Sequence, residues 1–292
     1  MITVKIIADS IANGVRITTA ELEYPRFIHA ELMTHRVFSR NSASSRAIPT
    51  KKMRQQVWNT PELPIHWGAN QSGMQAQTTL KTLPSSLARA LWKVASKAAC
   101  MFHWGMEKVK LHKQVSNRIL ETFQTMKVVV TSTEWANFLW LRNHEDAQPE
   151  IRELARQIST ALNNSVPNEL GYKEWHLPYI TDDMRECYEL QELLILSVSC
   201  CAQVSYRTLD MSFEKALRIF ESLTSGDRVH ASPFEHQATP IPNYHKLTKA
   251  KAKRIGVTHF DVDGGRWSGN FRGWIQHRQL IKGHAVVNLH KT

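Results

Sequence analysis

A segment of thirteen residues, 34–46, collects side chains that could bind an anion. It reads Thr-His-Arg-Val-Phe-Ser-Arg-Asn-Ser-Ala-Ser-Ser-Arg and holds three arginines and four serines. The planar guanidinium group of arginine presents a fork of donors that fits phosphate oxygens, and serine hydroxyls add short donors to the same oxygens. Composition alone favours a solvated surface loop of these residue types over a phosphate site. The order of the residues must therefore decide between the two interpretations.

The residue order in this segment resembles the motif Arg-His-Arg-x-x-Ser-x-Asn-Glu-x-Ser-x-Arg of the flavin-dependent thymidylate synthases. Two positions depart from that motif, since Thr34 stands in place of the first arginine and Ser42 in place of the glutamate. The resemblance implies that Ser44 and Arg46 bind dUMP, with Arg46 at its phosphate. It also implies that FAD is bound by His35, Arg36, Ser39 and Asn41.

A second stretch resembles the same family independently of the first. Residues 137–142, followed by Ala-Gln-Pro-Glu-Ile at 147–151, are similar to the helix Asn-Phe-Leu-x-Leu-Arg…Ala-Gln-x-Glu-Ile. By this resemblance Asn137 contacts FAD, and Arg142 is the catalytic residue that binds and polarises the uracil ring. A looser similarity upstream implies a further arginine for the dUMP phosphate, Arg118. Without the resemblance, residues 137–142 would be a surface helix with ordinary charge pairs.

A third match lies at 230–236, where His-Ala-Ser-Pro-Phe-Glu-His resembles the family's His-x-(Ser/Thr)-Pro-Phe-Glu-His. The resemblance implies that His230, Ser232 and Glu235 contribute to the FAD site. In the usual family order this motif precedes the Arg-His-Arg motif, whereas here it follows. The order predicts a circular permutant, which folded proteins tolerate because chain termini often lie close together at the surface.

A second pair of His and Arg occurs near the C-terminal end. The segment 270–278 resembles Arg-Gln-Trp-x-Arg-His-Arg at four of its residues, Arg272, Trp274, His277 and Arg278, but it lacks the serines that follow. One interpretation is a partial second copy of the motif, which would make Arg272, His277 and Arg278 accessory residues of the site. The other is an amphipathic helix docked by Trp274. Both remain open at this point.

The elements that must position these motifs are a few strands and many helices. Residues 2–8 and 15–18 predict two strands around a turn at Asn13-Gly14, and residues 27–35 show helical spacing. A polar stretch, 50–84, predicts a long loop or lid with a helical start. The patterns predict an α+β fold, with a mixed sheet and long packed helices, permuted from the flavin-dependent thymidylate synthase order. The predicted helical regions are 85–123, 134–164 with an interruption at Pro149, 184–206 and 213–223. In the first of them, one side is lined by an apolar stripe of Leu87, Leu91, Val94, Ala98, Met101 and Phe102.

No break in composition divides the chain, so we expect one catalytic domain over 1–292. Residues 1–165 would carry the Ser/Arg nucleotide motif and long helices, and 185–292 the permuted segment. No run of about 18 apolar residues could span a membrane. The spacing of the four cysteines suits neither a disulfide framework nor a metal site, which predicts reduced thiols in the cytoplasm.

The charge balance predicts an anionic partner. Lys and Arg number 37 against 26 Asp and Glu, for a formal charge of +11. Nucleic acid, nucleotides and folates would all fit such a charge, but no known nucleic-acid-binding motif accompanies it, so small molecules are expected. The resemblance implies reductive methylation of dUMP to dTMP with FAD, NADPH and methylenetetrahydrofolate, in a homotetramer. Two alternatives stay open: another C5 modification, such as hydroxymethylation, and a non-catalytic nucleic-acid-binding protein.

Overall fold

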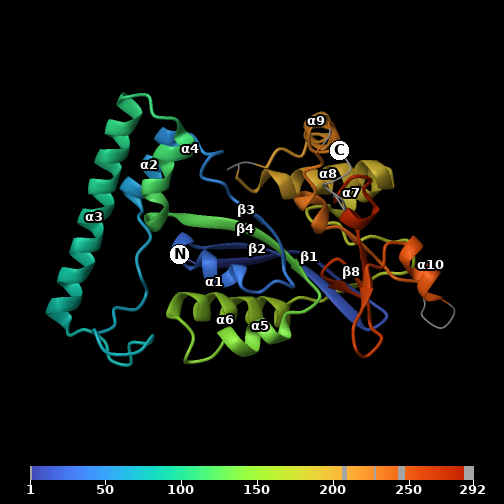
Figure 1. The fold of residues 1–292 in the computed structure, drawn as a ribbon, viewed down its shortest axis with the longest axis horizontal. Coiled ribbons are helices and arrows are strands. Elements are labelled where there is room, and N and C mark those ends of the chain that lie inside the picture. The colour runs from blue at the N-terminus through green and yellow to red at the C-terminus, as the bar shows by residue number, and fades with distance from the viewer. Residues whose placement is uncertain (1, 206–208, 227, 243–246, 286–292) are drawn as a thin grey trace, which may run out of the picture.

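The computed structural model describes residues 2–205, 209–226, 228–242 and 247–285 of the chain. A five-stranded mixed sheet lies at its centre, in the order β3-β4-β2-β1-β5 (Figure 1). Strands β1 (Thr3–Ala12) and β2 (Val15–Pro25) form an antiparallel hairpin. Its turn residues, Asn13 and Gly14, have φ of 49° and 76°, the left-handed backbone that a two-residue hairpin turn needs. The sequence prediction of this hairpin is confirmed, and both strands are longer than expected.

The central strand β4 (Thr125–Ser132) is an element that the sequence analysis missed. It pairs antiparallel with β2 on one side and with the edge strand β3 (Ser39–Ser42) on the other. Val128 and Val130 belong to the main core on one face of the sheet, and Val129 to a smaller core on the other face. The Val-Val-Val run is typical of a strand that is buried on both faces. β5 (Asn168–Glu169) pairs parallel with β1.

Helices cover both faces of this sheet. On one face lie α1 (His29–Met33), α5 (Ala136–Arg142) and α6 (Pro149–Asn164), which bury Leu32, Phe138 and Ile151 against β2 and β4. On the other face lies α8 (Leu190–Ala202), whose Cys201 packs on Val129. Figure 1 shows α5 and α6 on one side of the sheet and α8 with its neighbours on the other. Near α8 are α7 (Asp182–Cys187) and α9 (Phe213–Thr224).

Two of the predicted helical regions are divided where local geometry interrupts them. Region 134–164 becomes α5 and α6, because Gln148 accepts from the backbone N–H groups of Glu150 and Ile151 and so begins a new helix at Pro149. Proline suits the first helical position, where its missing N–H would be unpaired anyway. Region 184–206 becomes α7 and α8, and α8 begins with a capping box between Glu189 and Glu192.

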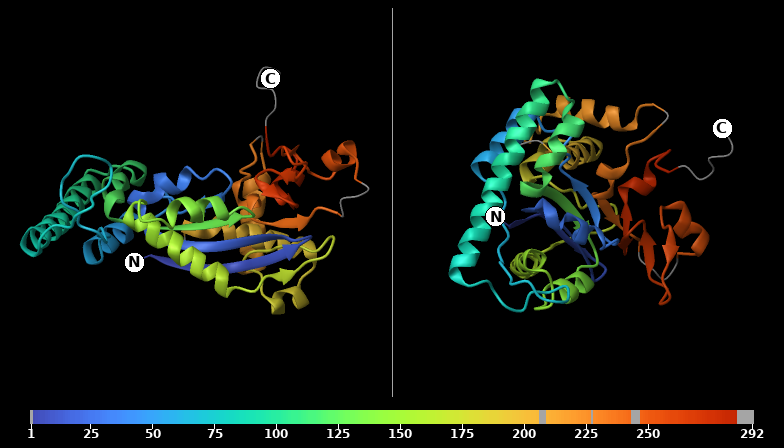
Figure 2. Two further views of the ribbon diagram at one scale, coloured as in Figure 1. Left: turned by 90° about the horizontal axis from the view of Figure 1, so that it is seen from below. Right: turned by 60° about the vertical axis from the view of Figure 1, so that its left-hand side comes forward.

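Three further helices form an arm at one side of the molecule, where α3 runs along the outer edge (Figure 2). These helices are α2 (Thr50–Asn59), α3 (Thr82–Lys108) and α4 (Lys113–Ser116), followed by the 3-10 helix η2 (Asn117–Phe123). The helical region expected at 85–123 is confirmed as helical but is not continuous, because α3 ends before Lys110, whose φ is 60°. The apolar stripe predicted on this helix exists, but Leu87 and Leu91 on it are each 60% exposed.

The C-terminal part consists of short elements. They are β6 (Ala238–Pro240), α10 (Lys249–Arg254), β7 (His259–Phe260), β8 (Arg266–Ser268), β9 (Phe271–Arg272) and β10 (Trp274–Gln276). Trp274 is fully buried against the end of the β1–β2 hairpin, and its Nε1 donates to the carbonyl of Val15. The amphipathic helix considered for 270–278 is therefore wrong, although Trp274 does dock the segment. None of the described helices is long and apolar enough to cross a membrane.

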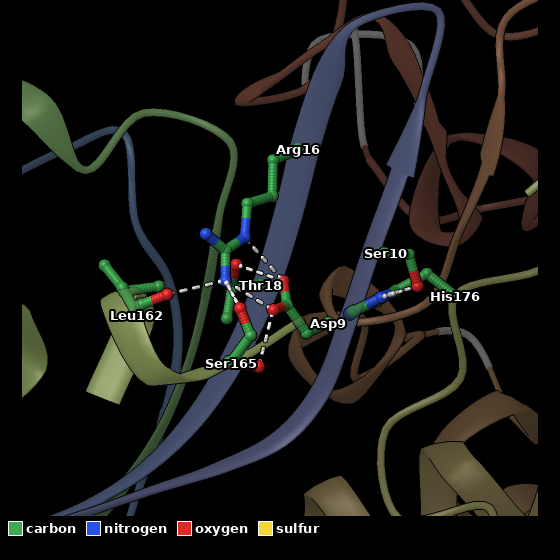
Figure 3. Close-up of polar contacts among 7 residues, drawn as sticks. All are labelled: Asp9, Ser10, Arg16, Thr18, Leu162, Ser165 and His176. Carbon is green, nitrogen blue, oxygen red and sulfur yellow. Dashed lines mark hydrogen bonds and ion pairs between the residues drawn. The ribbon is translucent and has the colours of Figure 1, made fainter. Parts of the chain in front are cut away.

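A polar cluster joins α6 to the hairpin (Figure 3). The carboxylate of Asp9 pairs with Arg16 at 2.5 Å and accepts from Thr18 and Ser165. Arg16 Nη2 also donates to the carbonyls of Leu162 and Ser165, at 2.9 and 3.1 Å, near the end of α6. Arginine at a helix C-terminus satisfies carbonyls that have no partner within the helix. This cluster holds the helix on the sheet, and we assign it no chemistry.

Candidate functional site

A cavity of about 640 Å³ lies where strand β3 faces the 3-10 helix η4 (Ser232–Glu235). That volume falls in the range of small-molecule sites. Its wall combines apolar side chains with donors and acceptors. The lining residues are Met33, Phe38, Ala202, Val204, Leu223 and Pro233 among the apolar ones, and His29, Arg40, Asn41, Ser42, Ser44, His230, Ser232 and Glu235 among the polar ones.

The cavity brings together two of the three motifs recognised in the sequence. Asn41 and Ser44 come from the Ser/Arg segment, and His230, Ser232 and Glu235 from the segment that ends at His236. Asn41 Nδ2 donates to the carbonyl of Cys201 at 3.1 Å, which ties β3 to the last turn of α8. The edge strand is thereby fixed against the elements that carry the opposite wall.

Ser39, a predicted FAD contact, lies behind this wall and not in it. Its side chain is fully buried. The Oγ atom donates to Asn270 Oδ1 at 3.0 Å and accepts from Gln276 Nε2 at 3.1 Å. Gln276 Nε2 also donates to Asn270 Oδ1 at 2.8 Å. Ser39 therefore joins the Ser/Arg segment to the C-terminal strands, an arrangement that sequence reasoning did not anticipate.

The two residues of the second His-Arg pair, His277 and Arg278, lie in different surroundings. Arg278 forms an ion pair with Glu235, which lines the cavity. His277 is buried under Phe234, with ring centroids 5.4 Å apart, and burial lowers the pKa of His277 to about 4. Arg272 pairs with Glu134 at 2.6 Å, just before α5. Of the three accessory candidates, Arg278 alone contacts a residue of the cavity wall directly in the described part of the chain.

His35 and Arg142 meet beside the cavity. Arg142 Nε donates to His35 Nε2 at 3.1 Å, and the Glu31 carboxylate lies 3.7 Å from Arg142 Nη1. His35 is buried, packs edge-on against Phe138, and adjoins Phe38, which lines the cavity. Burial lowers the pKa of His35, and the charges of Arg142 and Arg40 lower it further. A neutral His35 that accepts at Nε2 carries its proton on Nδ1.

Four other predicted residues are exposed and lie outside the lining of this cavity. They are Arg36, Arg46, Arg118 and Asn137. Arg46 and Arg118, both predicted at the dUMP phosphate, belong to segments joined by Asn117, whose Nδ2 donates to the carbonyls of Ser45 and Ile48 at 2.7 and 3.0 Å. Of the residues predicted for dUMP, Ser44 therefore lines the cavity, whereas Arg46 and Arg118 lie outside its lining.

The buried cysteines are poor nucleophiles. All four cysteines are free. Burial raises the pKa of the Cys200 thiol to about 12 and holds that of Cys201 well above its ordinary value, so the thiolate needed for attack is scarce. Among the described residues no group of three His, Cys, Asp or Glu side chains could hold a metal ion.

Two titratable residues of the cavity wall, Arg40 and His29, had no role in the sequence analysis. Arg40 belongs to the Ser/Arg segment, where it was counted among the arginines without a function. His29 comes from the start of α1, and its Nδ1 hydrogen bonds with the Tyr24 hydroxyl at 2.8 Å. Burial lowers the pKa of His29 to about 4, and Arg26 and Arg40 act in the same direction. The arginine-rich composition was the available signal for Arg40, and His29 had none.

Comparison with known proteins gives one family. The profile of the family described as thymidylate synthase complementing protein matches residues 8–168. Comparison with curated protein sequences finds no match. Among solved structures, the UMP/dUMP methylase PolB from Streptomyces cacaoi bound with 5-Br UMP has a TM-score of 0.46 at 16% identity, covering 56% of this chain and 88% of the other. Its complex with 5-Br dUMP has a TM-score of 0.45 at 15% identity, covering 56% and 90%.

Proposed function

The chain belongs to the thymidylate synthase complementing protein family, and on that premise we propose that it converts dUMP to dTMP by reductive methylation. Membership supports the coarser statement, an enzyme that modifies C5 of a pyrimidine nucleotide. The proposed co-substrates are methylenetetrahydrofolate and NADPH, with FAD as the cofactor. The observation that carries the proposal is the cavity whose lining combines residues of the Ser/Arg segment with residues of the 230–236 motif.

The cavity suits a flavin nucleotide in size and in chemistry. A volume of about 640 Å³ with apolar and polar lining fits a flat aromatic group joined to a polar chain. We propose that Asn41, His230, Ser232 and Glu235 hold FAD there, and that Ser44 in the same wall contacts dUMP. Bound FAD would supply the reducing equivalents that turn the transferred carbon into a methyl group.

Arg142 has the environment that the proposed catalytic role requires. Its guanidinium is half-buried, and Nε is held by the neutral ring of His35. A cation fixed in this way would stabilise negative charge that develops on the pyrimidine, without reorganising during the reaction. Arg46 and Arg118 would hold the nucleotide phosphate, which converts binding into orientation of the base. The cysteines take no part in this scheme.

We also propose that the chain is a circular permutant of the family. The family profile ends at residue 168, and the 230–236 motif lies beyond it. The contact between β3 and η4 across the cavity supports a C-terminal segment that performs the part of an N-terminal one. Two other proposals follow from the family: Arg36 and Asn137 as additional FAD contacts, and a single catalytic domain.

A homotetramer is the proposed assembly, with sites shared between copies. The exposed apolar stripe of α3 supports self-association, because large apolar patches on a surface usually mark interfaces. The exposure of Arg46 and Arg118 outside the cavity supports a site that a second copy completes. Four free cysteines support a reducing compartment, for which we propose the cytoplasm.

Product analysis tests the proposed reaction. The protein, with added FAD, is incubated with dUMP, methylenetetrahydrofolate and NADPH, and the nucleotide product is identified by mass spectrometry. We expect dTMP from the wild type. Arg142→Met should lower kcat by about 100-fold or more, the usual loss when a charge-stabilising donor is removed, while FAD still binds. Arg152→Met, on the exposed face of α6, serves as the matched control.

Other outcomes would redirect the proposal. A nucleotide with the mass of the hydroxymethyl product would support the alternative C5 modification. Protein that neither carries nor binds FAD would contradict the reaction. In that case, affinity for duplex DNA that falls steeply with salt would favour the nucleic-acid-binding alternative.

A further inference from the structure

We propose that Arg40 binds a phosphate group of the ligand in the cavity between β3 and η4. Arg40 lies on the edge strand β3, at a position that the family motif leaves open, and its side chain lines the cavity. The inference rests on the proposed function and names the residue that would meet the anionic part of FAD or of dUMP.

The guanidinium of Arg40 has one edge occupied and one edge free. Nη1 donates to the carbonyls of Leu32 and His35, at 3.0 and 3.1 Å, at the end of α1. Nε and Nη2 have no hydrogen-bond partner among the described residues. These two nitrogens form the side of the fork that binds two oxygens of one phosphate at once. The two carbonyls thus fix the orientation of a group whose bidentate edge is available to a ligand.

The charges around the cavity favour an anion at Arg40. Among the described lining residues, Arg40 is the one guanidinium and Glu235 the one carboxylate. Glu235 forms its direct ion pair with Arg278 and acts on Arg40 only through space, so Arg40 has no ion-pair partner among the described residues. His29 is neutral at physiological pH, because burial lowers its pKa to about 4. The Arg40 side chain is partly buried, and burial lowers the pKa of its guanidinium. A phosphate would compensate the charge of Arg40.

The competing explanation is that Arg40 only satisfies the last carbonyls of α1. That role uses Nη1 alone, so the loss of Arg40 would then change the affinity for every ligand of the cavity by the same factor. A phosphate contact, by contrast, discriminates between ligands that carry phosphate and those that do not. FAD with riboflavin, and dUMP with deoxyuridine, are two pairs of ligands that share a ring system and differ in phosphate.

The experiment titrates these four ligands against the wild type and Arg40→Gln. We expect Arg40→Gln to lower affinity for the phosphate-bearing member of one pair by about 10- to 100-fold, the usual effect of a hydrogen bond to a charged group. The unphosphorylated member should change little. Arg152→Gln removes an equal charge from the exposed face of α6 and should leave all four affinities unchanged. Arg40→Lys keeps the charge and a donor for the carbonyls, and should lose less affinity than Arg40→Gln.

Each result bears on the proposal. A loss confined to FAD over riboflavin assigns the phosphate to the flavin, and one confined to dUMP over deoxyuridine assigns it to the substrate. Equal losses within both pairs, or no loss in either, overturn the proposal while the proposed function stands. A wild type that binds neither FAD nor dUMP overturns both. If Arg40→Gln does not fold, the same comparison is made with Arg40→Lys.

Discussion

Two buried histidines are joined by a line of hydroxyl groups across the sheet. His176 Nε2 hydrogen bonds with Thr19 Oγ1 at 2.8 Å, Thr19 with Thr131 at 2.7 Å, and Thr131 with His236 Nδ1 at 2.8 Å. His236 ends the 230–236 motif, so this motif is tied directly to β4. Burial lowers the pKa of both histidines to about 3. Both rings are therefore neutral in the folded protein. As pH falls, they are protonated in the unfolded chain at a higher pH than in the folded protein.

The network predicts acid-sensitive stability. Because the folded pKa of each histidine lies below its unfolded value, the unfolded state binds more protons as pH falls through about 6.5 toward the folded values. Stability is fully present above that window and decreases through it. Each histidine should contribute about 1.4 kcal/mol per pH unit within the window. Denaturant unfolding at a series of pH values measures the slope.

The matched variants separate this network from other groups. His236→Gln should make the slope shallower by one histidine's share, whereas His144→Gln, which alters an exposed side chain, should not change it. An unchanged slope in His236→Gln would show that His236 does not contribute to the pH dependence of the free energy of unfolding.

At the scale of elements, the C-terminal strands hold β3 from behind. Gln276, on β10, bonds with both Ser39 and Asn270. Gly269 stands next to this group with φ of +60°, and a Cβ there would lie 2.4 Å from Gln276 Oε1. Glycine suits this position for two reasons: it adopts the left-handed backbone without strain, and it has no Cβ to collide with the side chain of Gln276.

This geometry predicts that Gly269→Ala destabilises more than a comparable glycine substitution. Gly264 also has positive φ, +81°, but a Cβ there would meet nothing within 4 Å. Both alanine variants carry the backbone strain, and Gly269→Ala must in addition displace Gln276. We expect an extra loss of about 1–3 kcal/mol in the free energy of unfolding, the range for a disrupted buried hydrogen-bonded group. Equal losses in the two variants would mean that Gln276 moves aside freely.

At the scale of the whole molecule, helices α2 and α3 of the arm expose apolar side chains. An apolar groove of about 1140 Å³ lies between these helices, lined by residues that include Trp58, Met101 and Phe102. Together with Leu87 and Leu91, these side chains give the arm a large apolar surface. Burial of such surface stabilises an assembly by roughly 25 cal/mol per Å² removed from water.

If the chain self-associates through this arm, charged substitutions on α3 should lower the molecular mass of the assembly. The double variant Leu87→Lys/Leu91→Lys should reduce the mass measured by sedimentation equilibrium, because charges would then enter an apolar interface. The double variant Val166→Lys/Val262→Lys places the same charges at exposed positions away from the arm and should keep the wild-type mass. An unchanged mass in the α3 variant would exclude this face of α3 as an interface.

Sequence reasoning was most successful where the signal is local. Asn13-Gly14 encodes its turn through backbone preference, and the order of residues in 34–46 and 137–151 was sufficient for the family. Strand β4 could have been recognised from its run of valines. By contrast, the exposure of Leu87 could not, because an amphipathic pattern shows that a helix has an apolar face and not whether the same chain covers it.

The sequence by itself determined the family, the α+β class, the hairpin and the segments that carry the motifs, since each depends on neighbours a few residues apart. Only the tertiary structure decided which side chains of those segments meet. Ser39 and Asn270 are separated by 231 positions and share a hydrogen bond, and Arg40 donates to carbonyls at the end of α1 while it lines the cavity beside η4. Such pairings depend on how helices and strands pack over long distances, and no local pattern of residues encodes that packing.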